Sequence, residues 1–166
     1  MSFELIKRLA VFFVLCVVQI LFLNHIRLFG VATPMLYIFF VIIFHRNTPK
    51  WALLLWSFAL GLAIDVFSNT PGLAAGSMTL IAIIQPYLLE LFIPRDSIEE
   101  LRVSSTTLGL GKYITFSTIL TVIYCLLFFA LEAFSFYNWI HWLTCAGSSA
   151  LLTLILILSI ETVRKK

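Results

Sequence analysis

Asp65 is the residue of this sequence with the greatest capacity for chemistry, because it stands inside the apolar segment Trp51–Phe67. An aspartate at the centre of a membrane span costs about 2.5–3.5 kcal/mol to insert, and it rarely occurs there without a role. Ser57, Gly61 and Asp65 follow one another at intervals of four residues, so a helix presents them on one face. Small residues on such a face let a neighbouring helix approach closely. We therefore expect Asp65 to face protein and not lipid.

Two roles are open for Asp65. It could bind a ligand, an ion or a proton, or it could accept hydrogen bonds from the start of the following helix. The turn after it favours the second role, because it contains many donors and because Pro71 is suited to a tight turn. The possible donors are Ser68, Asn69, Thr70 and the backbone amides around Gly72.

A second polar group lies within the apolar segment that follows. Gln85, Pro86 and Glu90 stand at its centre and towards its end. Pro86 removes a helical hydrogen bond, so we expect a kink that could build a transport site, as broken helices do in transporters. Prolines also occur in membrane helices for packing alone, which is the simpler interpretation. Glu90 could pair with Arg95 or reach towards lipid headgroups.

Glu132 and His141 lie around the last connection of the chain. An acid and an imidazole there could relay protons, but polar residues at a membrane interface are common and favour a structural interpretation. Small residues at Gly72 and Gly76, and again over Ala146–Ala150, have the spacing of close helix contacts. They could join helices within the chain or to a partner.

Motifs of membrane enzymes are missing from the sequence. It has no HExxH, no GxSxG, no paired-aspartate motif and no glycine-rich phosphate loop. Cys16, Cys125 and Cys145 lie in apolar segments without a CxxC spacing or a nearby histidine ligand, which indicates no metal site. We expect neither enzymatic activity nor a cofactor.

Six apolar segments must position these residues. Hydrophobic residues make up 61% of the 166 residues and charged ones 11%, where a soluble domain has roughly a quarter. A bilayer needs about 20 helical residues per span, so six spans leave no room for a soluble catalytic domain. The segments lack the alternation of barrel strands and are predicted to be helices. The predicted spans of this single all-α domain are 9–23, 30–44, 51–67, 77–93, 113–131 and 145–160.

The distribution of Lys and Arg predicts the orientation of these spans. Ten of the eleven fall on one side, and only Arg27 falls on the other. Because such residues collect in cytoplasmic loops, both termini are expected inside, and the first span is expected to be retained and not cleaved. The inner stretch Pro94–Lys112 is the one long polar connection. Asp96 and Glu99 predict the start of a short surface helix there, and Ser104–Gly111 is predicted to be flexible.

Several stretches of the sequence resemble one bacterial family. They are NHIRLFGVATPMLYIFFVI from Asn24 to Ile42, the segment from Trp51 to Leu80, PRD from Pro94 to Asp96 and LEAFSF from Leu131 to Phe136. The chain is similar over nearly its whole length to the rod shape-determining MreD family, especially to members from the Bacteroidota. The most specific part is GLAIDVFSNTPG, from Gly61 to Gly72.

The resemblance implies a small protein of the bacterial inner membrane with five or six spans. The implied fold is similar to the six-helix substrate-binding subunits of energy-coupling-factor transporters. The implied function is a noncatalytic scaffold of the cell-elongation complex, which organises side-wall peptidoglycan synthesis. Its implied partners are an MreC-like protein, a RodA-like glycosyltransferase, the elongation-specific transpeptidase and, indirectly, MreB. The other function that the sequence leaves open is a small-molecule-binding subunit of a membrane transporter.

Overall fold

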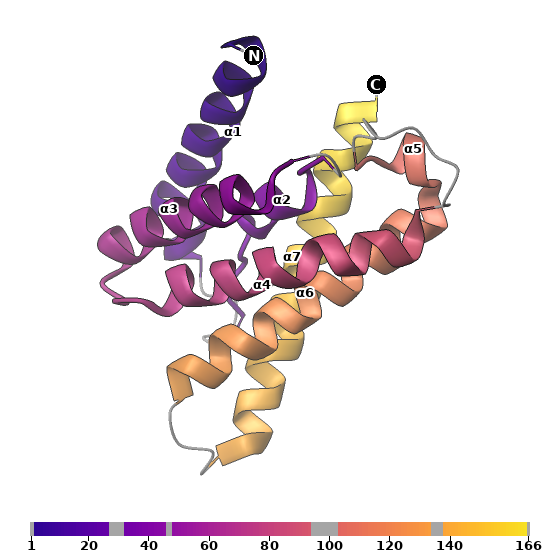
Figure 1. The fold of residues 1–166 in the computed structure, drawn as a ribbon. Coiled ribbons are helices and arrows are strands. Elements are labelled where there is room, and N and C mark those ends of the chain that lie inside the picture. Colours follow the sequence, from indigo (N-terminus) through magenta and orange to yellow (C-terminus); the bar gives the residue numbers. More distant parts are fainter. Residues whose placement is uncertain (1, 27–31, 46–47, 94–102, 134–137, 166) are drawn as a thin grey trace.

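The computed structural model describes residues 2–26, 32–45, 48–93, 103–133 and 138–165, and the described chain is largely helical (Figure 1). The helices follow the apolar segments because a backbone in hydrocarbon must satisfy its own hydrogen bonds. In order they are α1 (Ser2–Leu21), the short 3-10 helix η1 (Leu23–His25), α2 (Ile38–Ile42), α3 (Lys50–Ser68), α4 (Leu73–Phe92), α5 (Ser105–Leu108), α6 (Leu110–Ala133) and α7 (Trp139–Lys165).

Four of these helices, α3, α4, α6 and α7, are long and apolar enough to cross a membrane. They also turn large apolar side chains outward: Leu91 is 81% exposed and Val66 is 69% exposed. Such surfaces are typical of lipid contact and not of a water-soluble domain. The chain is therefore a membrane protein. α1 has 20 residues but carries Lys7 and Arg8 within its first two turns, and six spans remain a prediction.

The bundle is built from helix pairs. α3 and α4 form an antiparallel hairpin, α4 packs on α6, and α6 pairs with α7, while α1 packs on α3 (Figure 1). Both chain termini lie at one end of the molecule, away from the α3–α4 turn and the α6–α7 connection. In the interior, the hydroxyl groups of Tyr37 and Tyr124 are hydrogen-bonded to each other and their rings meet edge to face. The core thus joins the short α2 region to α6.

The predicted helix over 30–44 is wrong in its extent. Of the described residues in that range only Ile38–Ile42 form an α-helix, and 32–37 are not α-helical. The segment is nevertheless deeply buried, with Met35 3% and Tyr37 2% exposed. Non-helical backbone at membrane depth is tolerated only where protein or water surrounds it. Its backbone groups must therefore find partners in other helices.

Side chains of α1 and α7 supply these partners. The Gln19 side chain donates to the Pro34 carbonyl at 3.0 Å and accepts from the Leu36 amide at 3.1 Å. From the other side, Ser149 Oγ accepts from the Thr33 amide and Thr153 Oγ1 accepts from the Met35 amide, each at 3.0 Å. These bonds replace the helical bonds that a span over 30–44 would have made, which is why the apolar sequence alone misled the prediction.

Thr153→Val tests this arrangement, because valine keeps the shape and removes the acceptor. We expect the free energy of unfolding to fall by about 1–3 kcal/mol, since the buried Met35 amide loses its partner. Thr162→Val is the matched control. Like Thr153, Thr162 donates its hydroxyl to a carbonyl one turn earlier in α7, but Thr162 is exposed. Denaturant unfolding in detergent measures both variants. Equal losses would contradict the role of Thr153.

The long inner connection also differs from the prediction. Ser104–Gly111 is not a flexible run, because α5 and the first residues of α6 occupy it. Ser104 caps α5, and the Thr107 side chain accepts from the Ser104 amide at 3.2 Å, a capping box in which threonine takes the usual place of glutamate. Asp96 and Glu99 lie outside the described residues, so the surface helix predicted there stays a prediction.

Candidate functional site

Asp65 lies in the last turn of α3, and its carboxylate binds the start of α4. Oδ1 accepts from the Ala74 amide and Oδ2 accepts from the Ala75 amide, each at 2.9 Å. The Thr70 hydroxyl donates to Oδ1 at 3.0 Å. The side chain is only 5% exposed. A carboxylate that satisfies two free amides at a helix N-terminus also interacts favourably with the helix dipole, so Asp65 has the structural role that the donor-rich turn favoured.

The turn between α3 and α4 is shaped by two residues in left-handed conformation. Asn69, at φ 56°, ends α3, and its amide and that of Thr70 both donate to the Asp65 carbonyl. Gly72, at φ 84°, precedes α4. Asparagine and glycine are the residues that adopt this conformation most readily. The SNTPG sequence thus reverses the chain within a few residues and returns the α4 amides to Asp65.

Gly61 brings the two helices of the hairpin into close contact. A Cβ atom at this position would lie 2.6 Å from Ala75 Cα and 2.7 Å from the Ala74 carbonyl oxygen, which are backbone atoms and cannot move aside alone. Gly76 is different, since a Cβ there would meet only the Leu131 side chain of α6, at an ordinary 3.7 Å. Of the small residues predicted to pack, Gly61 is therefore the one that the α3–α4 contact requires.

Ser57 completes the predicted face of α3. It is fully buried, and its Oγ has no hydrogen-bond partner among the described residues. Its small side chain, like Gly61 one turn later, suits a close contact between α3 and its neighbours.

The second predicted polar group, Gln85, Pro86 and Glu90, lies apart from Asp65 in the structure. α4 continues through Pro86 from Leu73 to Phe92, and Gln85 lies about 15 Å along the helix from the Ala75 amide that Asp65 binds. Gln85 is 2% exposed, and its Nε2 has no partner in the described part of the chain. Glu90 is exposed, and Arg95, with which it was expected to pair, lies outside the described residues. The structure therefore contains two separate groups and not one intramembrane polar centre.

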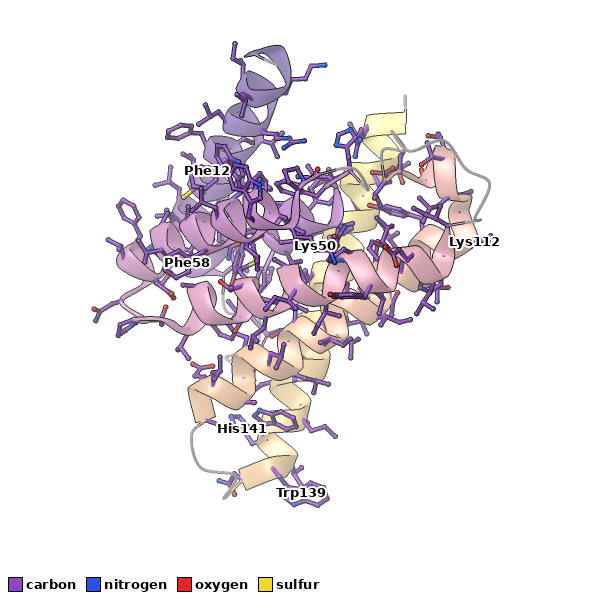
Figure 2. All side chains as sticks on the ribbon, viewed as in Figure 1. Phe12, Lys50, Phe58, Lys112, Trp139 and His141 are labelled. Carbon is purple, nitrogen blue, oxygen red and sulfur yellow. The ribbon has the colours of Figure 1, made fainter. Side chains whose placement is uncertain are left out.

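A cavity of about 290 Å³ adjoins the Asp65 turn. It lies between α1, the 32–37 segment, α3 and α6, and Thr70 and Ala74 form part of its wall. Gln19 and Tyr37 line it, but their polar groups already bond within the protein. Glu132 lines this cavity, whereas His141, near the start of α7 (Figure 2), does not line it and lies 3.6 Å from Cys145 Sγ. His25, which the sequence analysis did not single out, also lines the cavity.

Glu161 is a buried carboxylate that the sequence analysis missed. It is 3% exposed, accepts from Ser104 Oγ at 2.7 Å and from the Ser105 amide at 2.9 Å, and lies 3.5 Å from Arg164. It holds the start of α5 much as Asp65 holds the start of α4. Its partners Ser104 and Ser105 lie 57 and 56 residues earlier in the chain, so no local sequence pattern indicates its role.

The described residues contain no cluster of three or more side chains that could hold a metal ion. Within the described ranges no three His, Cys, Asp or Glu side chains come together, and Cys16, Cys125 and Cys145 are free thiols.

The chain matches no protein-family model, no curated protein and no solved structure.

Proposed function

We propose that this protein is a noncatalytic scaffold of the bacterial cytoplasmic membrane that belongs to the cell-elongation machinery. The observation that carries the proposal is the state of Asp65: the most prominent carboxylate of the membrane segments is used for three hydrogen bonds within the protein. A carboxylate engaged in this way stabilises the α3–α4 hairpin, and this use fits a protein that acts through its shape. The segment GLAIDVFSNTPG, which resembles the MreD family, contains Asp65 and forms the turn between α3 and α4. This resemblance is the reason for placing the scaffold in the cell-elongation machinery.

The proposed topology has six spans with both termini in the cytoplasm. Lys7, Arg8, Lys50 and Arg164 lie towards the helix ends that the Lys and Arg distribution assigns to the inside. The Asp65 turn then lies at the outer surface. This position would let the hairpin turn contact envelope proteins on the outer side of the membrane.

A groove between α6 and α7 supports a contact with another membrane protein. It has a volume of about 420 Å³ and is lined only by apolar and small side chains, among them Ala146, Gly147 and Ala150 of α7. Small residues permit close helix packing in a bilayer, where shape complementarity and not water exclusion drives association. A transmembrane helix of an MreC-like or RodA-like protein suits this groove.

Photo-crosslinking in native membranes tests the scaffold function. A photoreactive residue replacing Leu151, which lines the groove and is 62% exposed, should capture an MreC-like or RodA-like protein. The same residue replacing Leu91 of α4, 81% exposed and outside the groove, is the control and should capture mainly lipid. The elongation-specific transpeptidase and MreB should be recovered through these partners. Failure to recover any elongation protein from the Leu151 position, or equal recovery from the Leu91 control, would refute the proposal.

The second candidate function is a small-molecule-binding subunit of a transporter. The cavity beside the Asp65 turn favours it, because Glu132 and His25 offer ionisable groups at its wall. A ligand that binds only the folded protein at 100 times its Kd stabilises it by about 2.7 kcal/mol. Thermal unfolding in detergent with a panel of vitamins and metabolites would detect this effect. A specific shift that Glu132→Gln removes would favour the transporter function over the scaffold.

A further inference from the structure

His141 and Cys145 form a pair of metal-ligating side chains at the end of the molecule away from both chain termini (Figure 2). Nε2 of His141 lies 3.6 Å from Sγ of Cys145. The His141 side chain is exposed, and the Cys145 side chain is half-buried and carries a free thiol. Both ligand atoms can therefore meet ions that approach this end of the protein.

The prediction that no histidine ligand lies near Cys145 is wrong. The span predicted over 145–160 began at Cys145 itself, which left His141 in the preceding connection. In the structure α7 already begins at Trp139, so both residues belong to one helix. Side chains four residues apart lie on the same face of a helix, one turn from each other. Two histidines bind zinc from this spacing in the HExxH motif, and here a cysteine takes the place of the second one.

The distance between the two ligand atoms fits a tetrahedral ion. Zinc binds cysteine sulfur at about 2.3 Å and histidine nitrogen at about 2.0–2.1 Å. Ligands at these distances are about 3.1 Å apart at a right angle, about 3.5 Å apart at the tetrahedral angle and about 4.3 Å apart in a linear arrangement. The observed 3.6 Å agrees with the tetrahedral value. The pair thus already has the separation that such an ion requires.

The surroundings of the pair favour a soft cation. Glu132, at the end of α6, is close enough to interact electrostatically with Cys145. The sequence from Glu132 to Trp142 contains no Lys or Arg that would repel a cation. Thiolate and imidazole ligands select ions such as Zn²⁺, whereas Mg²⁺ and Ca²⁺ prefer oxygen.

We propose that His141 and Cys145 bind a Zn²⁺ ion, with water in the two remaining positions of the tetrahedron. No third His, Cys, Asp or Glu of the described residues joins the pair, so the protein supplies two ligands. On binding, the sulfur–hydrogen bond of Cys145 breaks, the sulfur–zinc bond forms and the proton passes to water. Neither residue lines the groove between α6 and α7, so the site adds to the scaffold function without resting on it.

Metal binding to the full-length protein in detergent, without a histidine tag and under reducing conditions, tests the proposal. Co²⁺ should give the sulfur-to-metal charge-transfer band of a cobalt–thiolate bond, and Zn²⁺ should then remove this band. Cys145→Ser and His141→Ala should each weaken Zn²⁺ binding by at least about 10-fold, the lower end of what even an outer partner of a metal ligand contributes. His25→Ala is the matched control, because His25 is also exposed but has no cysteine one turn away.

The substitution Cys145→His tests the geometry separately. It keeps two ligands at the same helical spacing, so Zn²⁺ binding should persist while the cobalt–sulfur band disappears. Thermal unfolding in detergent establishes that each variant is folded before its metal binding is compared. Unchanged Zn²⁺ affinity in Cys145→Ser or in His141→Ala, or an equal loss in His25→Ala, would overturn the assignment. Binding of one ion per two chains would overturn the two waters and assign the ion to a contact between two copies.

Discussion

Gly61→Ala is expected to lower the free energy of unfolding by about 2 kcal/mol or more, although alanine is the better helix former. The added methyl group would lie 2.6 Å from Ala75 Cα and 2.7 Å from two further backbone atoms of α4. Because no side-chain rotation relieves contacts with backbone, α3 and α4 must move apart. That movement also lengthens the hydrogen bonds from the α4 amides to Asp65, one turn away.

Gly147→Ala is the matched control for this substitution. Gly147 also lies within a helix, but a Cβ atom there meets nothing within 4 Å. We expect it to be neutral or to add up to about 1 kcal/mol through helix propensity. Denaturant titration of both variants in detergent measures the two free energies of unfolding. A Gly61→Ala protein as stable as the Gly147→Ala protein would show that the hairpin tolerates a wider separation.

Removing the Asp65 carboxylate is expected to have the largest effect of any single side-chain change considered. Asp65→Ala leaves the buried amides of Ala74 and Ala75 without acceptors, and each unsatisfied donor costs about 1–3 kcal/mol. Asp65→Asn keeps one carbonyl oxygen but turns an NH₂ group towards the other donor, so its loss should be smaller. Both variants should lower the steady-state protein level and the recovery of partner proteins.

Glu90→Gln is the control for a lost carboxylate, because Glu90 is exposed on α4 and has no resolved role in the hairpin. Exposed substitutions usually change stability by less than about 0.5 kcal/mol. Immunoblotting of membranes and partner copurification measure the three proteins in parallel. Normal level and normal partner recovery in Asp65→Asn would contradict the structural role of Asp65.

The sequence predicted those features that depend on local pattern. The apolar segments of span length correspond to α3, α4, α6 and α7. The four-residue spacing of Ser57, Gly61 and Asp65 predicted that one face of α3 packs against protein, and Ser57 and Asp65 are buried. The donor-rich turn after Asp65 predicted its hydrogen bonds to α4 because all the groups lie within ten residues.

Features that depend on distant partners could not be predicted in the same way. Residues 32–37 belong to a largely apolar stretch that resembled a span, and among the described residues Ser149 and Thr153 of α7, together with Gln19, bond to their non-helical backbone. Glu161 likewise owes its role to Ser104 and Ser105, which are far away in the sequence. In each case a side chain in one helix satisfies backbone in a segment that has no periodic signal of its own.

The bonds from Thr33 and Met35 to α7 set an order of assembly. Their acceptors, Ser149 and Thr153, are made 116 and 118 residues later, so the early segment must wait for α7 before its amides are satisfied. At 5–20 residues per second this wait lasts roughly 6–25 s of synthesis. Until then the segment must keep water, lipid headgroups or the insertion machinery beside it. The core around Thr33 and Met35 thus closes only after α7 has been made, and a ribosome that stops before α7 leaves these amides without their acceptors.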